Sequence, residues 1–191
     1  MSGLTTVALF LVSLLFSLLI FTLWLRIAVR YFRISALNPL SQLIHTITDP
    51  LIEPIQFVVK QKPKSGDLYD IPTIILLILV ELVKIILISL IAFHGLMNIG
   101  YLVLYVLADL ILQPCDLLFF VILIRVIMSF VNPAWNGPIA DFLRIITEPL
   151  LKLGRKIIPD ISGFDFSPFI ILMILKVITL FINASLPWRL L

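Results

Sequence analysis

Charged side chains are scarce in this chain. They make up 13% of its 191 residues, about half of the roughly 25% that soluble domains carry. Apolar residues make up 61%, against about 45–50% in soluble domains, and the mean hydropathy is +1.19. This balance excludes a soluble globular domain and indicates a membrane protein. The net charge of +3 does not indicate nucleic-acid binding, because the lysines and arginines cluster beside apolar runs and form no basic module.

Cysteine is nearly absent as well. Cys115 is the single one in the sequence, which excludes an internal disulfide bond. It lies in an apolar stretch, where packing is the expected role of a free cysteine. The N-terminus lacks both the positive segment and the small-residue cleavage site of a signal peptide, so we expect the first apolar run to be retained as a helix.

What the sequence does contain is an internal repeat. Residues 26–51 and 125–150 match at a constant offset, including the spacing of their apolar residues. The clearest matches are Arg26 with Arg125, Pro39 with Pro138, and Thr48-Asp49-Pro50-Leu51 with Thr147-Glu148-Pro149-Leu150. Because long apolar runs flank both copies, the repeat unit is a membrane hairpin. We therefore predict two repeats, residues 1–98 and 99–191.

Four apolar runs are long enough to cross a bilayer, at residues 4–25, 71–93, 103–124 and 168–186. A helix of such length, at about 1.5 Å per residue, matches the roughly 30 Å hydrocarbon core. Between the two spans of each repeat, residues 39–59 and 138–158 predict amphipathic helices in the membrane surface. In the first of them the apolar stripe consists of Leu40, Leu43, Ile44, Ile47, Leu51, Ile55 and Val58. Pro50 and Pro54 should break or kink this helix. The predicted fold class is an all-α membrane protein with four spans.

The charges between the spans predict the orientation. An even number of spans places both long loops on the same side of the membrane. These loops carry Arg30, Arg33, Lys60, Lys62, Lys64, Arg144, Lys152, Arg155 and Lys156. The positive-inside rule then places the loops in the cytoplasm and both termini outside. The two halves have the same orientation, as parallel repeats do.

Features of a catalytic or metal site are missing. His45 and His94 lie far apart in the chain and on opposite sides in this topology, so they cannot share one metal ion. The sequence has no Cys-x-x-Cys-His motif, no glycine-rich phosphate loop and no credible pair of nucleophile and base. We therefore expect no enzymatic activity, no catalytic, cofactor-binding or metal-binding residues, and no cofactor.

The motifs of the second half follow one another in a specific order. They are Arg125-Val126-Ile127-Met128-Ser129-Phe130, Thr147-Glu148-Pro149-Leu150-Leu151, Arg155-Lys156-Ile157-Ile158-Pro159 and Gly163-Phe164-Asp165-Phe166-Ser167-Pro168. In this order they resemble the YggT repeat, called YlmG in other bacteria and in plastids. The resemblance covers essentially the whole chain, as the two-repeat form. The first copy departs from the pattern at residues 56–59, where a basic pair and a proline are expected, and at residues 67–72, which replace Gly-x-Asp-x-Ser-Pro.

The resemblance implies a small integral protein of the bacterial inner membrane with no established biochemical activity. Members of the family are linked to osmotic-stress tolerance and to cell or organelle division, and plastid relatives to assembly of a haem-containing complex. The motif residues that the resemblance singles out are Arg26, Pro39, Thr48, Asp49, Pro50, Arg125, Pro138, Thr147, Glu148, Pro149, Arg155, Pro159, Gly163, Asp165, Ser167 and Pro168. The second copy is the better candidate for chemistry or binding.

Two interpretations of the motif residues stay open. The Thr-Asp-Pro and Thr-Glu-Pro segments could bind a partner or a lipid headgroup, or they could be turns in which side chains bond the nearby backbone. Arg155 and Lys156 could attract anionic lipid, although setting the topology is a sufficient reason for their charge. We expect Ser167 to be the N-cap of the last span and Pro168 its first helical residue.

Polar residues inside the predicted spans are the second set of candidates. They are Glu81, Lys84, Asp109, Gln113, Asp116 and Lys176. A charge at mid-membrane costs about 2.5–3.5 kcal/mol on insertion scales, so it needs a partner or a water-lined cavity. We expect Glu81 to pair with Lys84, and Lys176 to pair with Asp109 or Asp116. These residues could form an ion or proton path, or they could hold the helices together. Asp109 and Asp116 correspond to Phe10 and Ser17 in the first half, which argues against a symmetric pore.

The leading functional hypothesis is a non-enzymatic membrane scaffold or assembly factor. Two surface helices on the cytoplasmic face would bend lipid or dock a partner, with Leu143 and Ile146 on the docking face. The alternative is a small oligomeric channel or transporter that uses Asp109, Asp116 and Lys176. The expected partners are the lipid bilayer, other membrane or division and assembly proteins, and a second copy of the chain, but no nucleic acid.

Overall fold

The computed structural model describes residues 3–60, 69–132, 135–157 and 165–187. Within these ranges the chain forms six α-helices and no strand. Four of them, α1 (Gly3–Tyr31), α3 (Ile71–Phe93), α4 (Ile99–Val131) and α6 (Ser167–Ser185), are long and apolar enough to cross a membrane. The predicted all-α fold is confirmed, together with four helices that have the length and composition of membrane spans.

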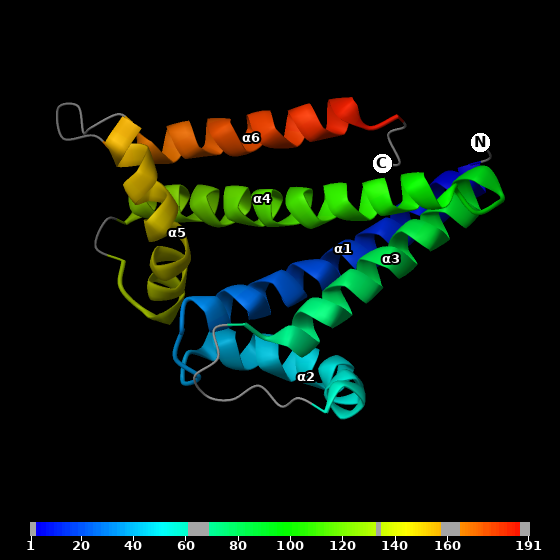
Figure 1. Ribbon diagram of the computed structural model, residues 1–191. Helices are drawn as coiled ribbons and strands as arrows, with labels where there is room; N and C mark the ends of the chain where they lie inside the picture. Colours follow the sequence, from blue (N-terminus) through cyan, green and yellow to red (C-terminus); the bar gives the residue numbers. More distant parts are fainter. Residues whose placement is uncertain (1–2, 61–68, 133–134, 158–164, 188–191) are drawn as a thin grey trace.

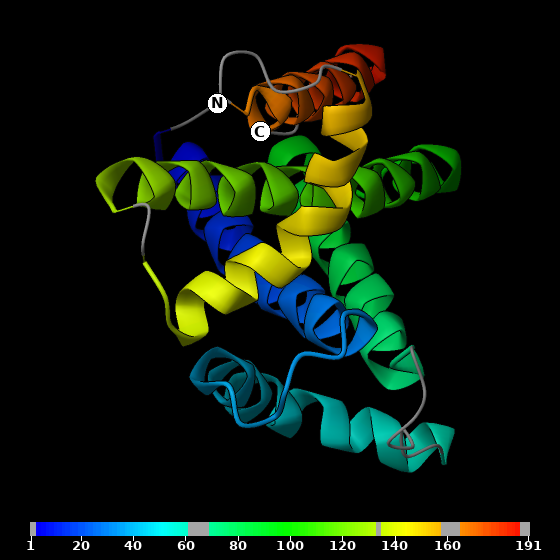
Figure 2. The same ribbon diagram turned by 90° about the vertical axis from the view of Figure 1, so that its left-hand side faces the viewer.

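The remaining helices, α2 (Pro39–Val59) and α5 (Pro138–Ile157), lie at the same end of the bundle (Figure 1). The start of α1, the α3–α4 connection and the end of α6 lie at the opposite end. Figure 2 looks onto the end that carries α2 and α5, and both helices run across the line of view. The spans pack as two pairs, α1 with α3 and α4 with α6, and α1 crosses α4 between them.

Two helices extend beyond the spans that the sequence predicts. The sequence places the end of the first span before Arg26 and the end of the third before Arg125, because an arginine normally marks the membrane surface. In the structure α1 continues to Tyr31 and α4 to Val131. Arg26 was expected at the membrane interface but is only 4% exposed. Its charge is satisfied by bonds inside the protein, so the helix need not end there.

The prolines do not break the helices in which they lie. Helix α2 runs through Pro50 and Pro54, and α5 runs through Pro149. A proline inside a helix removes one backbone hydrogen bond and costs about 3 kcal/mol. Ile44, Thr48 and Ile52 are buried along one face of α2, and this burial offsets the loss.

The core at this end joins α2 and α5 to α1 and α4. Ile44 of α2 and Phe142, Leu143 and Ile146 of α5 pack into one cluster with residues of α1 and α4. The expectation that Leu143 and Ile146 form a free docking face is therefore wrong, since both are buried in the protein itself. The predicted apolar stripe of α2 is likewise divided, with Ile44 buried and most of its other members exposed.

Helix α5 also meets α6 at very short range through Gly154. A Cβ atom at this position would lie 2.9 Å from Cβ of Ser167 and 3.1 Å from Cγ1 of Ile171. The distance to Ser167 is shorter than real Cβ contacts, and the distance to Ile171 is tighter than most of them. The close approach of the two helices therefore favours a residue without a side chain.

Candidate functional site

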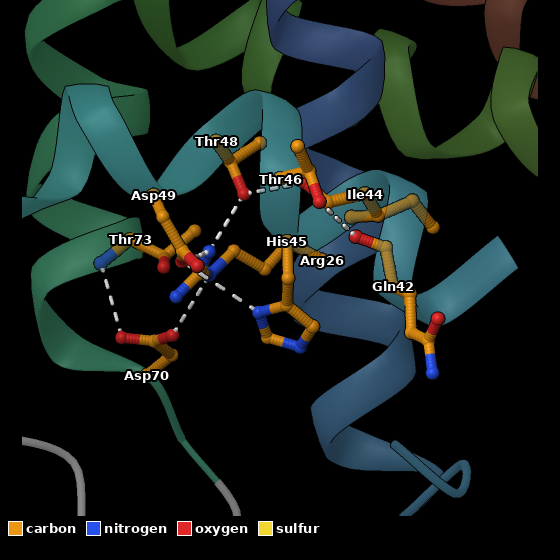
Figure 3. A network of polar contacts seen from close by, with 9 residues as sticks. All are labelled: Arg26, Gln42, Ile44, His45, Thr46, Thr48, Asp49, Asp70 and Thr73. Atoms are coloured by element: carbon orange, nitrogen blue, oxygen red, sulfur yellow. Dashed lines mark hydrogen bonds and ion pairs between the residues drawn. The ribbon is translucent and has the colours of Figure 1, made fainter. Parts of the chain in front are cut away.

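The first arginine network consists of Arg26, Thr48, Asp49 and Asp70, which come from α1, α2 and the residue before α3 (Figure 3). Nη1 of Arg26 donates to Oγ1 of Thr48 at 2.6 Å and to Oδ1 of Asp49 at 2.5 Å. Nε of Arg26 donates to Oδ2 of Asp70 at 3.3 Å. One buried guanidinium group of α1 thus bonds both α2 and the residue before α3.

Each partner in this network also stabilises its own helix. Oγ1 of Thr48 donates to the carbonyl oxygen of Ile44 at 2.7 Å, so the hydroxyl group is both donor and acceptor. Oδ1 of Asp70 accepts from the backbone N–H of Thr73 at 3.4 Å, which places Asp70 as the N-cap of α3. The side chain of Asp70 is only 1% exposed, whereas that of Asp49 is 50% exposed.

The second arginine network consists of Arg125, Thr147, Glu148, Arg155 and Asp165. Nη1 of Arg125 donates to Oγ1 of Thr147 at 2.6 Å, and Nη2 donates to Oε2 of Glu148 at 2.9 Å. Thr147 Oγ1 donates to the carbonyl oxygen of Leu143 at 2.7 Å. The bonds from arginine to threonine and from threonine to the preceding turn are therefore the same in both networks.

Arg155 is the feature that distinguishes the second network. Its Nη1 donates to Oε1 of Glu148 at 2.9 Å, and its Nε donates to Oδ2 of Asp165 at 3.0 Å. The four charged side chains of this network are about one fifth to one third exposed, while Thr147 is buried. The second network therefore has two arginines and lies in a wetter environment, whereas the first has one arginine in a buried one.

The helix entry at Asp165 differs from the sequence prediction. Ser167 was expected to be the N-cap of α6, but it is the first residue of the helix. Its buried hydroxyl group has no hydrogen-bond partner among the residues that the structure describes. Oδ1 of Asp165 accepts from the backbone N–H of Ser167 at 2.8 Å. A carboxylate that bonds both Arg155 and this N–H satisfies more donors than a serine hydroxyl group could.

Asp70 is the residue that sequence reasoning missed. The first copy lacks the Gly-x-Asp-x-Ser-Pro motif, yet Asp70 bonds an arginine through one oxygen and the start of α3 through the other, as Asp165 does at α6. The available signal was an aspartate two residues before Pro72, whereas Asp165 lies three residues before Pro168. Pro39 and Pro138 are the first residues of α2 and α5, while Pro159 and Gly163 fall outside the described residues.

The ionisation of the surface residues follows from these bonds. Burial raises the pKa of Glu148, but the hydrogen bonds and charges of Arg125 and Arg155 outweigh it, and the pKa lies below its ordinary value. The pKa of Asp165 is lowered as well, because its bonds with Ser167 and Arg155 outweigh burial. Burial and the charge of Arg26 lower the pKa of His45 despite the Asp49 carboxylate 3.8 Å away.

A separate charged cluster lies between the spans. Nζ of Lys84 lies 3.2 Å from Oε2 of Glu81 and 2.7 Å from Oδ2 of Asp109. The Glu81–Lys84 pair agrees with the sequence prediction. The pairing of Asp109 with Lys176 does not occur, because Lys84 of α3 faces Asp109 across the α3–α4 contact. Glu81 is fully buried, and its Oε1 atom has no hydrogen-bond partner.

The other polar candidates, Asp116, Lys176 and Gln113, lie outside this cluster. Asp116 and Lys176 are exposed on α4 and α6, and Gln113 is half-buried. The two charges are close enough to interact, but they form no ion pair within 4 Å in the described part of the chain. Nζ of Lys176 lies over the ring of Phe119, 5.6 Å from its centroid.

The two arginine networks fix α2 to α1 and α5 to α4. Within the ranges that the structure covers, no group of three His, Cys, Asp or Glu side chains could hold a metal ion.

Beside the second network, a pocket of about 140 Å³ is lined by Arg125, Ser129, Trp135 and Arg144, among others. Its arginine, serine and tryptophan side chains suit a small anionic group at a membrane surface.

Comparison with known proteins agrees with the sequence resemblance. The CCB3/YggT family model matches residues 5–91 and again residues 103–186. An uncharacterized protein of Pseudomonas aeruginosa is 34% identical over 190 residues, which cover 97% of this chain and 93% of that protein. An uncharacterized protein of Vibrio alginolyticus is 34% identical over 85% of each chain. Uncharacterized protein YggT of Escherichia coli K12 is 31% identical over 90% of this chain and 86% of its own. No solved structure matches. From the two family matches and these relatives, the chain belongs to the CCB3/YggT family.

Proposed function

We propose that this protein is a non-enzymatic scaffold or assembly factor of the bacterial inner membrane, built from two tandem hairpin repeats, residues 1–98 and 99–191. In each repeat an amphipathic helix is fixed at the cytoplasmic surface, where it docks other membrane proteins. The function belongs to the envelope, in osmotic-stress tolerance or cell division. The observation that carries the proposal is that two arginine networks of the same design clamp α2 and α5 at one end of the bundle.

The motif residues support a structural role in this scaffold. Asp49 and Glu148 both bond an arginine of the preceding span, so they hold the surface helices in place. A hydrogen bond to a charged group contributes about 1.5–3 kcal/mol, and each network contains several. A docking surface benefits from being rigid, because ordering a mobile surface when a partner binds lowers the affinity. The networks keep the two helices rigid in this way.

The outer faces of the two helices differ in chemistry. On α2, Leu43, Ile47 and Leu51 are exposed and fall on one helical face. On α5, Arg144 and Lys152 are exposed beside the exposed apolar residues Ile145 and Leu153, so this face carries positive charge as well as apolar side chains. The basic face supports a cytoplasmic orientation next to anionic lipid. The apolar face of α2 is the proposed contact for a membrane protein partner.

The test is complementation combined with crosslinking in cells. In an Escherichia coli strain without YggT, the wild-type chain should restore growth after osmotic shock, and a photo-crosslinker at Phe57 should give discrete bands with the same membrane proteins in repeated experiments. Phe57 is exposed on α2. The variant Ile47→Ser/Leu51→Ser should lose both the growth phenotype and the bands at an unchanged expression level.

The matched control is Gln42→Ser/Thr46→Ser, which alters exposed polar residues of the same helix and should behave as the wild type. If the apolar variant complements fully and keeps its crosslinks, α2 is not the docking surface and the scaffold proposal fails.

A channel or transporter that uses Asp109, Asp116 and Lys176 is the alternative. The geometry favours the scaffold, because Asp109 is bonded to Lys84 inside the bundle while Asp116 and Lys176 are exposed on its outside. Ion flux through wild-type protein in liposomes that falls in Asp109→Asn, with folding retained, would favour the channel instead.

A further inference from the structure

Two opposite charges stand on the outer surface of the spans. Asp116 and Lys176 are both exposed, and they belong to α4 and α6, which pack side by side along one edge of the bundle (Figure 1). The exposed surface of a membrane span normally faces hydrocarbon, which tolerates apolar side chains and penalises charges. The two exposed charges would therefore be unfavourable if lipid alone covered this edge of the bundle.

Both residues lie too far from the ends of their helices for their side chains to reach the lipid headgroups. Lys176 is at the midpoint of α6 (Ser167–Ser185), about 14 Å from either end at ~1.5 Å per residue. A lysine side chain near a helix end extends to the headgroups, but from the midpoint it is too short to do so. Asp116 is close to the midpoint of α4 (Ile99–Val131), and its shorter side chain is confined more strongly.

The contacts within one copy do not remove the charges from the surface. The Lys176 ammonium group lies over the ring of Phe119, on the same helix as Asp116. It is not within ion-pair distance of Asp116 in the part of the chain that the structure describes. The patch formed by Asp116, Phe119 and Lys176 thus carries one acid and one base that both remain exposed.

We propose that this patch is the interface with a second copy of the same chain. A two-fold axis along the membrane normal keeps both copies in one orientation and brings each patch against itself. Such a contact places Lys176 of one copy against the partner's Asp116, and the reverse. One acid and one base on a self-facing patch make two complementary ion pairs, and the dimer removes all four charges from lipid.

Exposed apolar residues surround the patch and would pack in the same contact. Phe120 follows Asp116 by one turn of α4, and Met173 and Leu180 flank Lys176 on α6. This interface involves the spans alone, so it is independent of the docking surface proposed for α2.

The experiment measures energy transfer between copies in vesicles of phosphatidylethanolamine and phosphatidylglycerol. Donor or acceptor tags are placed at the C-terminus, and the protein-to-lipid ratio is varied. The wild type should dimerise, and Asp116→Lys or Lys176→Asp alone should raise the dissociation constant at least about tenfold, since like charges then face each other. Glu53→Lys, a charge reversal on an exposed residue of α2, is the matched control and should not change it.

Mixing the two variants separates a contact between copies from a pair within one copy. A chain with Asp116→Lys and a chain with Lys176→Asp restore both ion pairs only when they meet, so the mixture should recover dimerisation that neither variant has alone. If the mixture stays monomeric, the two residues do not pair across an interface. If the wild type does not self-associate at any ratio, a different protein covers the patch. Either result overturns the proposal.

Circular dichroism and detergent gel filtration check that the variants fold. If a reversed charge prevents insertion, Asp116→Asn and Lys176→Gln keep the side-chain size and add no repulsion. They should still weaken dimerisation severalfold, and an unchanged dissociation constant in both would refute the ion pairs.

Discussion

Removal of Arg26 should destabilise this protein more than removal of the corresponding Arg125. In the variant Arg26→Met, the Asp70 carboxylate stays buried, with a side chain 1% exposed, and loses its cation. Breaking one side of a buried ion pair costs about 3–5 kcal/mol. The loss at Asp49 adds less than about 1 kcal/mol, since this carboxylate is half exposed.

The matched change Arg125→Met leaves its partners better satisfied. Glu148 keeps Arg155, and Thr147 keeps its bond to the carbonyl oxygen of Leu143. Since Glu148 is also 32% exposed, we expect a loss of about 1–2 kcal/mol. The two variants should therefore differ by about 2 kcal/mol, which is roughly a thirtyfold difference in the unfolding equilibrium.

The assay is reversible unfolding in mixed micelles with increasing dodecyl sulfate, followed by circular dichroism. The double variant Arg26→Met/Asp70→Asn should recover most of the loss, because it removes the unpaired buried charge and keeps a side-chain oxygen that can accept from the backbone N–H of Thr73 at the start of α3. Lys152→Met, at an exposed position on α5, controls for loss of a positive charge and should stay within about 0.5 kcal/mol of wild type. An Arg26→Met variant no less stable than Arg125→Met would refute the argument from burial.

Three further perturbations test other parts of the structure. Gly154→Leu should force α5 away from Ser167 and cost about 1–3 kcal/mol in the same unfolding assay; a neutral result would mean that the helices are not in close contact. Lys84→Met should cost about 3 kcal/mol or more, because two carboxylates lose their cation, and a protein of wild-type stability would show that the cluster is already neutral. The pKa of Glu148 lies below the ordinary 4.5, so its contribution to stability is present above about pH 4.5 and is lost as the pH falls through its lower folded pKa. The stability difference between wild type and Glu148→Gln, measured from about pH 6 downwards, should shrink over that range; a difference that does not change with pH would contradict the role of the carboxylate.

The sequence predicted some helices to the residue and others less well. The predicted ranges 39–59 and 71–93 coincide with α2 and α3, because a proline near the start and a polar segment at a boundary are local signals. Helices α1 and α4 continue past the predicted ends of the first and third spans, residues 25 and 124. Arg26, the first arginine after the first span, is buried inside the protein.

The sequence predicted several residues of the candidate site but not which residues bond to one another. Arg26, Thr48 and Asp49 are singled out by the repeat, and the structure places them within hydrogen-bond distance of one another. Asp70 lies outside the matching segments, so only the packing of α3 against α1 and α2 reveals its part in the network. The same holds for Lys84, whose partner Asp109 is on another helix.

The sequence by itself determined the all-helical fold and the four helices that are long and apolar enough to cross a membrane, because apolar length and the scarcity of charge are properties of the chain alone. It also determined which residues share one face of a helix, since the helical period fixes that spacing. Only the tertiary structure decided which faces meet. It joined Lys84 to Asp109, buried Leu143 and Ile146, and left Asp116 and Lys176 on the outside. The physical reason is that each helix can rotate and tilt as a unit without changing its own pattern, so side-chain packing across the whole bundle sets the partners.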